Sequence, residues 1–225
     1  MSKLVWDQTG QKKYETGIEQ CALFVQSDEG TYPKGVAWNG VTKFSEAPSG
    51  AEPTKIYADN QKYLELLSAE EFGGTLSAYM YPDEFEQCDG SAEIADGVTV
   101  GQQERKPFGL AYKTIVGNDV KKNNFGYKLH LVYGCLAKPS SMEYSTVNDS
   151  PEVPEMSWEV STTPVAVAGL KPTATLVIDS TKCDTDKLKK IEAIIYGSED
   201  KDAELPLPDA IAAIFKETAA QEPQG

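Results

Sequence analysis

Hydrophobic and polar residues alternate through much of this chain with a period of two, which is the spacing of β-strands. The alternation is strongest in residues 74–81 (GTLSAYMY), where successive side chains would point to opposite faces of a sheet. The other predicted strands occupy residues 18–26, 36–44, 107–116, 127–136, 156–161 and 173–178. Several of these strands are apolar on both faces, which indicates burial on both sides. The pattern predicts a mainly β fold, an antiparallel β-sandwich or partial barrel.

Residues 56–85 form the stretch around which we expect the sheet to be organised. Asp59 and Asn60 predict a sharp turn between two extended segments, because their side chains bond to nearby backbone and tolerate left-handed conformations. A glycine pair then precedes the strongest strand. Pro82 followed by acidic residues predicts a short helix over residues 82–88, since proline suits a first helical turn and acids complement the helix dipole.

The hydrophobic spacing changes to that of helices after the last predicted strand. Leu188, Ile191 and Ile195 form an apolar stripe, with Asp184 as the expected N-cap and Gly197 as the expected C-cap. A second short helix, opened by a proline, follows in LPLPDAIAAIFKE. We interpret both helices as packing elements.

These elements divide the chain into four predicted parts. They are an N-terminal arm (1–17), a β-sandwich domain (18–164), a C-terminal strand-helix-helix extension (165–217) and a disordered tail (218–225). Within the domain, residues 27–55 contain Pro48, Gly50 and Pro53 and predict a long loop or hairpin. Loops of this length are uncommon unless they have a function.

The chain is acidic, with 21 Lys and Arg residues against 35 Asp and Glu residues, and Arg105 is its only arginine. The net charge of −14 argues against a protein that grips nucleic acid, because such proteins neutralise phosphates with basic side chains. No apolar run approaches the roughly 18 residues of a membrane span, and residues 1–17 have no signal-peptide pattern. We therefore expect synthesis in a cytoplasm and no membrane partner.

The sequence contains no recognisable catalytic constellation. A Ser-His-Asp or Cys-His arrangement would have to use His130, the only histidine, and no serine lies in a GxSxG motif. Phosphate-binding glycine motifs are also absent. Six acids between positions 82 and 97 do not match an EF-hand loop, so we interpret them as a solvated surface and keep ion binding as a minor hypothesis. The four scattered cysteines favour buried, reduced thiols. We expect no enzyme activity, no cofactor and no metal.

Several longer segments carry a resemblance to one family. They are YADN, GGTLSAYMYPDEF, KPFGLAYKT followed by YKLHLVYGCLAKPS, SWEVSTTP, and DKLKKIEAIIYG followed by LPLPDAIAAIF. Together, over residues 18–217, they resemble the major tail proteins of long, non-contractile-tailed bacteriophages, the subunits of the tail tube. The resemblance implies a β-sandwich with one flanking helix, whose subunits form hexameric rings that stack into a hollow tube.

The resemblance also implies the partners and the location of the protein. The subunits would bind each other, enclose the tape measure protein, and meet initiator (distal tail) and terminator proteins at the ends of the tube. DNA would pass through without specific binding. The localisation would be the virion tail, after assembly in the host cytoplasm.

Candidate contact residues follow from aromatic positions and from the same resemblance. Aromatic residues are enriched in interface cores, although an ordinary half-buried role for these tyrosines stays open. The proposed subunit interface consists of Tyr57, Asp59, Asn60, Tyr79, Tyr81 and Tyr133. In the family, the region corresponding to residues 27–55 reaches towards the next ring. The ring-stacking residues proposed within it are Tyr32, Trp38 and Phe44.

Other classes of protein stay open at this point. A monomeric ligand- or carbohydrate-binding β-sandwich would also be acidic and rich in tyrosine, and would show an aromatic platform. A hydrolase on the same scaffold would show a cleft with converging carboxylates of perturbed pKa. A contractile-tail tube protein or a ring protein of a secretion system would be the nearest neighbour in function.

Overall fold

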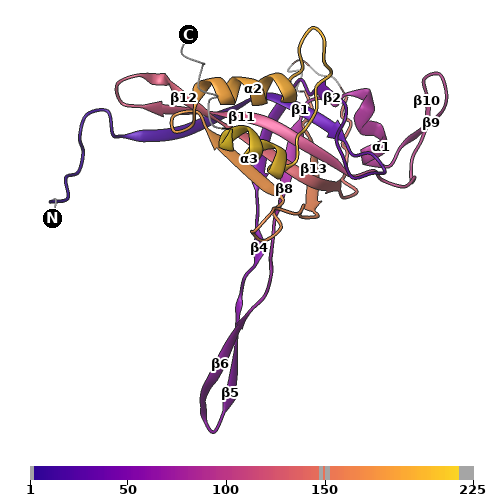
Figure 1. The fold of residues 1–225 in the computed structure, drawn as a ribbon. Helices are drawn as coiled ribbons and strands as arrows, with labels where there is room; N and C mark the ends of the chain where they lie inside the picture. Colours follow the sequence, from indigo (N-terminus) through magenta and orange to yellow (C-terminus); the bar gives the residue numbers. More distant parts are fainter. Residues whose placement is uncertain (1–2, 147–148, 150–152, 218–225) are drawn as a thin grey trace.

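The computed structural model describes residues 3–146, 149 and 153–217, so the predicted tail at 218–225 lies outside the described residues. Strands dominate the chain (Figure 1). The main sheet contains β1 (Lys13–Val25), β2 (Gly35–Ala37), β3 (Val41–Glu46), β8 (Gly73–Ala78), β11 (Phe108–Asn118), β12 (Lys122–Ala137), β13 (Met156–Thr162) and β14 (Thr175–Asp179). Smaller pairs are formed by β4 (Ser49–Gly50), β5 (Pro53–Ala58), β6 (Gln61–Leu67), β7 (Glu70–Glu71), β9 (Ala92–Ala95) and β10 (Val98–Val100). The helical elements are η1 (Asp83–Phe85), α1 (Glu86–Asp89), α2 (Thr185–Ile195) and α3 (Pro208–Lys216).

Eight strands form one antiparallel sheet in the order β2-β1-β11-β12-β13-β8-β3, with β14 as a branch on β12. The branch exists because β12 is 16 residues long and one of its edges is divided between two partners. Residues 128–132 pair with β14, whereas residues 135–137 pair with β13. The sheet therefore separates into a layer β2-β1-β11-β12-β14 and a second layer β13-β8-β3. This arrangement confirms the expected mainly β, sandwich-like fold.

The first hydrophobic core lies between the two sheet layers. It joins Leu23 and Leu110 of the first layer to Leu76 and Trp158 of the second. All four side chains are fully buried. Phe85, at the end of η1, packs against the same core with its ring centroid 5.1 Å from that of Trp158. The predicted short helix at 82–88 is therefore present, as η1 and α1, and its role is to cover this core.

The second core lies on the opposite face of the first layer, under α2 and α3 (Figure 1). Leu129 and Leu131 of β12 pack in it with Ile191 and Ile195 of α2. The side chain of Asp184 accepts hydrogen bonds of 3.0 Å from two backbone N–H groups in the first turn of α2, which confirms the predicted N-cap. The central strands are thus buried on both faces, as their apolar composition predicts.

A bulge near the end of β12 changes the face on which its side chains lie. Strict alternation predicts Tyr133 and Cys135 on one face, but Tyr133 belongs to the second core and Cys135 to the first. Gly134, between them, has a φ of +59°, and the register with β11 shifts at this point. Glycine adopts this left-handed conformation without strain, so it is the residue that permits the bulge.

The long projection predicted at residues 27–55 is displaced along the chain. Residues 27–34 fold against the body, because the fully buried Tyr32 accepts a hydrogen bond of 2.8 Å from the backbone N–H of Gly134. The segment that leaves the body is residues 47–72 (Figure 1). The prediction was therefore right about an extended projection but wrong about its bounds.

The two ends of the described chain are also more firmly attached than predicted. β1 begins at Lys13, so the last residues of the predicted N-terminal arm (1–17) are strand, paired with β11. The predicted extension (165–217) contributes β14 to the main sheet and α2 and α3 to the second core. The extension is therefore part of the same folded unit.

Substituting Ile191 tests this integration. We expect Ile191→Ala to lower the free energy of unfolding by about 2–5 kcal/mol, because it removes a fully buried side chain and leaves a cavity. Urea unfolding followed by tryptophan fluorescence should show one transition at a lower midpoint. The exposed Lys189→Ala is the control on the same helix. A separate early transition for α2, with an unchanged midpoint for the sheet, would contradict the single unit.

Candidate assembly interface

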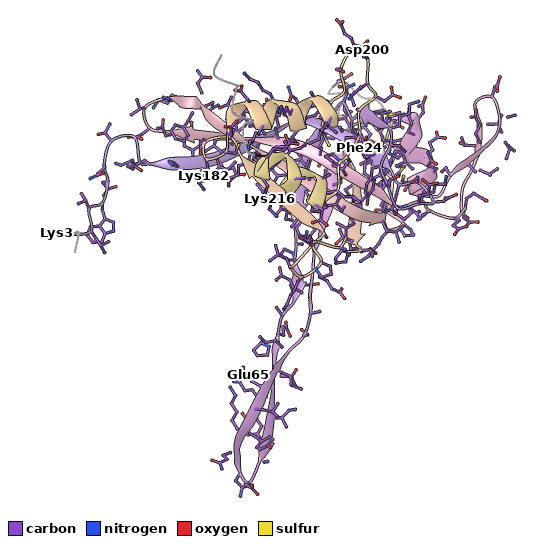
Figure 2. All side chains as sticks on the ribbon, in the orientation of Figure 1. Lys3, Phe24, Glu65, Lys182, Asp200 and Lys216 are labelled. Atoms are coloured by element: carbon purple, nitrogen blue, oxygen red, sulfur yellow. The ribbon has the colours of Figure 1, made fainter. Side chains whose placement is uncertain are left out.

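Residues 47–72, which we call the arm, form a long hairpin that leaves the body and ends away from it (Figures 1 and 2). The short pair β4–β7 forms its root, and β5–β6 form its shaft. The tip is the turn at Asp59 and Asn60, whose φ angles are +51° and +62°. Positive φ at both central residues is the geometry of a two-residue hairpin turn, and Asn and Asp tolerate it. The turn predicted from the sequence is therefore confirmed.

The arm carries large apolar side chains that lie exposed on both of its faces. Tyr57 is 66% exposed and Leu67 is 72% exposed on one face. Ile56 and Leu66 are exposed on the other. A two-stranded hairpin is marginally stable alone in water, and each exposed aliphatic side chain forgoes about 1.5–3 kcal/mol of burial energy. Apolar surface displayed in this way is typical of interaction sites.

Two further projections expose apolar residues. In the N-terminal segment before β1, Leu4, Val5 and Trp6 are exposed. On the opposite side of the body, the hairpin β9–β10 exposes Ile94 and Val98 (Figure 1). Ten of the 21 large apolar side chains that are exposed in the described residues thus lie on three segments that extend from the body in different directions.

The total accessible surface reflects these projections. It measures 15,487 Å² for a chain of 24.5 kDa. A compact monomer of this mass exposes only about 10,000 Å². The difference is comparable to the roughly 2,000–5,000 Å² that permanent subunit interfaces bury.

Four of the six predicted interface residues lie at the surface. Tyr57, Asp59 and Asn60 are brought together at the end of the arm, where all three are exposed. Tyr79 is half exposed and lies on the body, where its backbone N–H bonds to the carbonyl of Gly40. The prediction therefore describes one patch on the arm and one separate residue on the body.

The other two predicted interface residues pack against core side chains of the subunit. Tyr133 is fully buried, and its hydroxyl donates a hydrogen bond of 2.9 Å to the carbonyl of Pro206. Tyr81 packs against Phe85 and Trp158, with ring centroids 5.8 Å apart in each pair. The position of Tyr133 on an alternating strand suggested exposure, but both faces of β12 are covered by the fold. The prediction is corrected at Tyr133, whereas at the partly exposed Tyr81 it stays a prediction.

The predicted ring-stacking residues also belong to the body rather than to the arm. Tyr32 is fully buried, and Trp38 is buried with its indole N–H donating to the carbonyl of Met80 at 2.8 Å. Phe44 is partly buried, and its ring centroid is 5.4 Å from that of Tyr112. Tyr32 lies in the second core and Trp38 in the first, and their burial corrects their assignment to ring stacking. For the partly buried Phe44 the assignment stays a prediction.

Sequence reasoning missed the apolar residues on the returning strand of the arm. Tyr63, Leu66 and Leu67 are all exposed, although YLELL looks like part of a core strand. The available signal was the position of this run directly after the predicted Asp59-Asn60 turn. Alternation alone does not show whether a second layer covers a strand, so exposure of this run was not predictable.

A group of polar side chains lies where the arm joins the body. His130 of β12 is 8% exposed, and its ring stacks on that of Tyr112 at a centroid distance of 4.8 Å. The Tyr112 hydroxyl donates a hydrogen bond of 2.9 Å to Glu46, the last residue of β3 before the arm. Glu15 of β1 lies on the other side of the imidazole, 3.4 Å from its Nε2 atom. We call these four residues the arm-root cluster.

Burial and neighbouring charges shift the protonation of this cluster. Burial lowers the pKa of His130 below its ordinary value, although the carboxylates of Glu46 and Glu15 oppose the shift. Burial acts to raise the pKa of Glu15, but hydrogen bonds from Lys128 and Thr114 bring it below its ordinary value. Near neutral pH the cluster therefore contains a neutral His130 imidazole and a charged Glu15 carboxylate.

Outside this cluster we looked in the described residues for metal-binding groups and reactive thiols. They contain no group of three or more His, Cys, Asp or Glu side chains placed to hold a metal ion. Burial raises the pKa of Cys21 and of Cys88 to about 12, so both thiols are unreactive. None of the described helices has the length and apolar composition needed to cross a bilayer. The exposed projections are thus the features that point to a function.

Comparisons with known proteins leave the family open. No protein-family model matches this chain, and no curated protein matches its sequence.

Polar substitutions on the arm test whether its apolar residues serve the subunit itself. We expect Leu66→Ser with Leu67→Ser to change the free energy of unfolding by no more than about 0.5 kcal/mol, because both side chains lie outside the cores. Leu76→Ala, in the first core, should cost about 2–5 kcal/mol in the same urea titration. A comparable loss in the arm variant would mean that the arm folds back onto the body in solution.

Proposed function

We propose that this protein is the subunit of a tail tube, a structural virion protein that assembles into stacked hexameric rings. The exposed apolar arm is the observation that carries this proposal. It supports an assembly in which a neighbouring subunit covers surfaces that the subunit leaves open. In the proposed role the tube houses the tape measure protein and conducts DNA during ejection, as the sequence resemblance implies.

The length of the arm favours contact between rings. From the end of β3 to the turn at Asp59 the chain advances 13 residues, since Glu46 is the last residue of β3. At about 3.3 Å per residue this gives a reach of about 43 Å. A compact chain of this length has a radius of gyration of about 17 Å, which corresponds to a sphere about 45 Å across. The arm can therefore extend along the whole height of one neighbouring subunit.

Open strand edges favour contact within a ring. β2 covers only residues 22–24 of the outer edge of β1. Within the part of the chain that the structure describes, residues 13–20 of that edge and residues 122–126 of β12 pair only with β11. Unpaired edges promote association with further strands. Joining them around a ring would continue the sheet from subunit to subunit and close these two edges.

The charge of the chain agrees with a conduit for DNA. A net charge of −14 repels phosphate groups, whereas a basic wall would bind them. DNA would therefore pass without specific binding. The proposed partners at the two ends are the initiator (distal tail) and terminator proteins, and the proposed location is the virion tail, with assembly in the host cytoplasm.

Electron microscopy tests the proposal directly. Concentrated purified protein, imaged in negative stain and measured by sedimentation, should form hollow tubes or six-subunit rings. Leu66→Ser with Leu67→Ser should abolish the tubes, because polar side chains remove the apolar contact between rings, while the fold stays intact. Leu170→Ser, which changes an exposed leucine outside the arm, is the control and should assemble normally.

Two results would count against this function. Tubes formed by the arm variant would show that the arm does not join the rings. A wild-type chain that stays monomeric at high concentration, and that binds a glycan or another small ligand, would favour a monomeric ligand- or carbohydrate-binding β-sandwich.

A further inference from the structure

The arm-root cluster contains a buried histidine nitrogen without a hydrogen-bond partner. Nδ1 of His130 is enclosed, and no donor or acceptor in the described structure reaches it. It lies 3.7 Å from Oε1 of Glu46, beyond hydrogen-bond distance. A buried nitrogen in this state is costly unless it gains a partner. The arrangement therefore needs a physical explanation.

The hydrogen bonds around the ring determine which nitrogen carries the proton of the neutral imidazole. Thr114 has one hydroxyl hydrogen, and it donates this hydrogen to Glu15 at 2.6 Å. The same hydroxyl oxygen is 2.9 Å from Nε2 of His130, so it must accept a hydrogen bond there. Nε2 is then the protonated nitrogen. Nδ1 carries only its lone pair and faces the carboxylate of Glu46.

We propose that Nδ1 of His130 is a proton-binding site that fastens the root of the arm to the body. On acidification the Nδ1 lone pair takes a proton from solvent, and the ring becomes a cation that donates to Oε1 of Glu46. An N–H bond forms at Nδ1 as an O–H bond of hydronium breaks, and no bond of the protein breaks. The new charge-assisted hydrogen bond joins β12 to β3, the strand that leads into the arm.

The groups that face the imidazole support this site. Glu46 approaches from β3 and Glu15 from β1, so each nitrogen has a carboxylate beside it. Tyr112 and Thr114 of β11 contribute a stacked ring and a hydroxyl. Lys128, on the same strand as His130, is a cation whose charge acts on the ring, and it is paired with Glu15. The side chain of Glu46 is 43% exposed, which leaves solvent a route for the proton.

Proton uptake has opposite effects on the whole fold and on the arm root. Because burial lowers the pKa of His130, the unfolded chain binds the proton first, and stability falls as the pH drops from the ordinary histidine pKa to the lowered one. Within the folded state, however, Glu46 favours the charged ring. By linkage the proton must then favour the conformation in which Glu46 stays beside His130.

The consequence for assembly rests on the proposed function, whereas the proton site does not. If the arm joins rings, fastening its root at acidic pH restricts the directions in which it points. Assembly of the wild-type chain should then depend on pH over the range in which His130 titrates. His130→Gln should assemble without that dependence.

Nuclear magnetic resonance of the full chain tests the site, because the imidazole of the only histidine gives a single set of signals. At pH 7.5 the ring nitrogens should show the Nε2–H tautomer, and the titration midpoint should lie below the ordinary value of about 6.5. Glu46→Gln should lower the midpoint further, because the neutral amide no longer favours the charged ring. We expect a decrease of about one unit, the lower end of the range for a carboxylate at this distance. Glu70→Gln, which removes one charge from β7, should leave it unchanged.

Hydrogen exchange tests the fastening itself. In the wild type, and after correction for intrinsic rates, amides of β3 should exchange about threefold more slowly at pH 5 than at pH 7.5. The same amides in Glu46→Gln should show no such change. An Nδ1–H tautomer at pH 7.5, a midpoint insensitive to Glu46→Gln, or faster exchange at pH 5 would overturn the proposal. None of these three measurements requires tube formation, so they test the proton site even if the proposed function is wrong.

Discussion

The division of one edge of β12 between two partner strands is the constraint on which the rest of the structure depends. Residues 128–132 bond to β14 and keep it in the first layer, while residues 135–137 bond to β13 and start the second layer. The bulge at Gly134 lies between these two sets. Because the strand changes face there, Tyr133 packs under the helices and Cys135 packs between the sheets. This one irregularity therefore decides which core receives each of the two side chains that flank it.

The body of the protein folds around its own two cores and does not depend on the arm for stability. The two cores bury large side chains from nearly every strand of the main sheet, so the fold does not need the apolar residues of β5 and β6. These residues stay exposed, and in the proposed function a neighbouring subunit covers them. The arm root is different, because Glu46 links it to Tyr112 and approaches His130 inside the body. The polar contacts at the root therefore connect the conformation of the arm to the charge of a buried side chain.

Part of the candidate interface was predictable because local chemistry determines it. The Asp59-Asn60 turn follows from side chains that tolerate positive φ, and the cap of α2 follows from Asp184. Contact residues were predicted less well. Tyr32, Trp38 and Tyr133 are aromatic residues in strands or loops of the kind that also occurs in interfaces, but here they are core residues. An aromatic side chain tends to be buried, but its chemistry does not show whether the same subunit or another one covers it.

By itself, the sequence determined the local elements of this protein: alternating strands, the hairpin turn, the short helix after Pro82, and two capped or proline-opened C-terminal helices. These elements depend on residues a few positions apart in the chain, because hydrophobic periodicity and backbone preference are properties of short segments. Only the tertiary structure decided which strands are covered and which project. It placed β14 in the main sheet, left β5 and β6 exposed, and brought Glu15, Glu46 and His130 together from three strands. Such contacts depend on the pairing of distant segments, which hydrophobic periodicity does not specify.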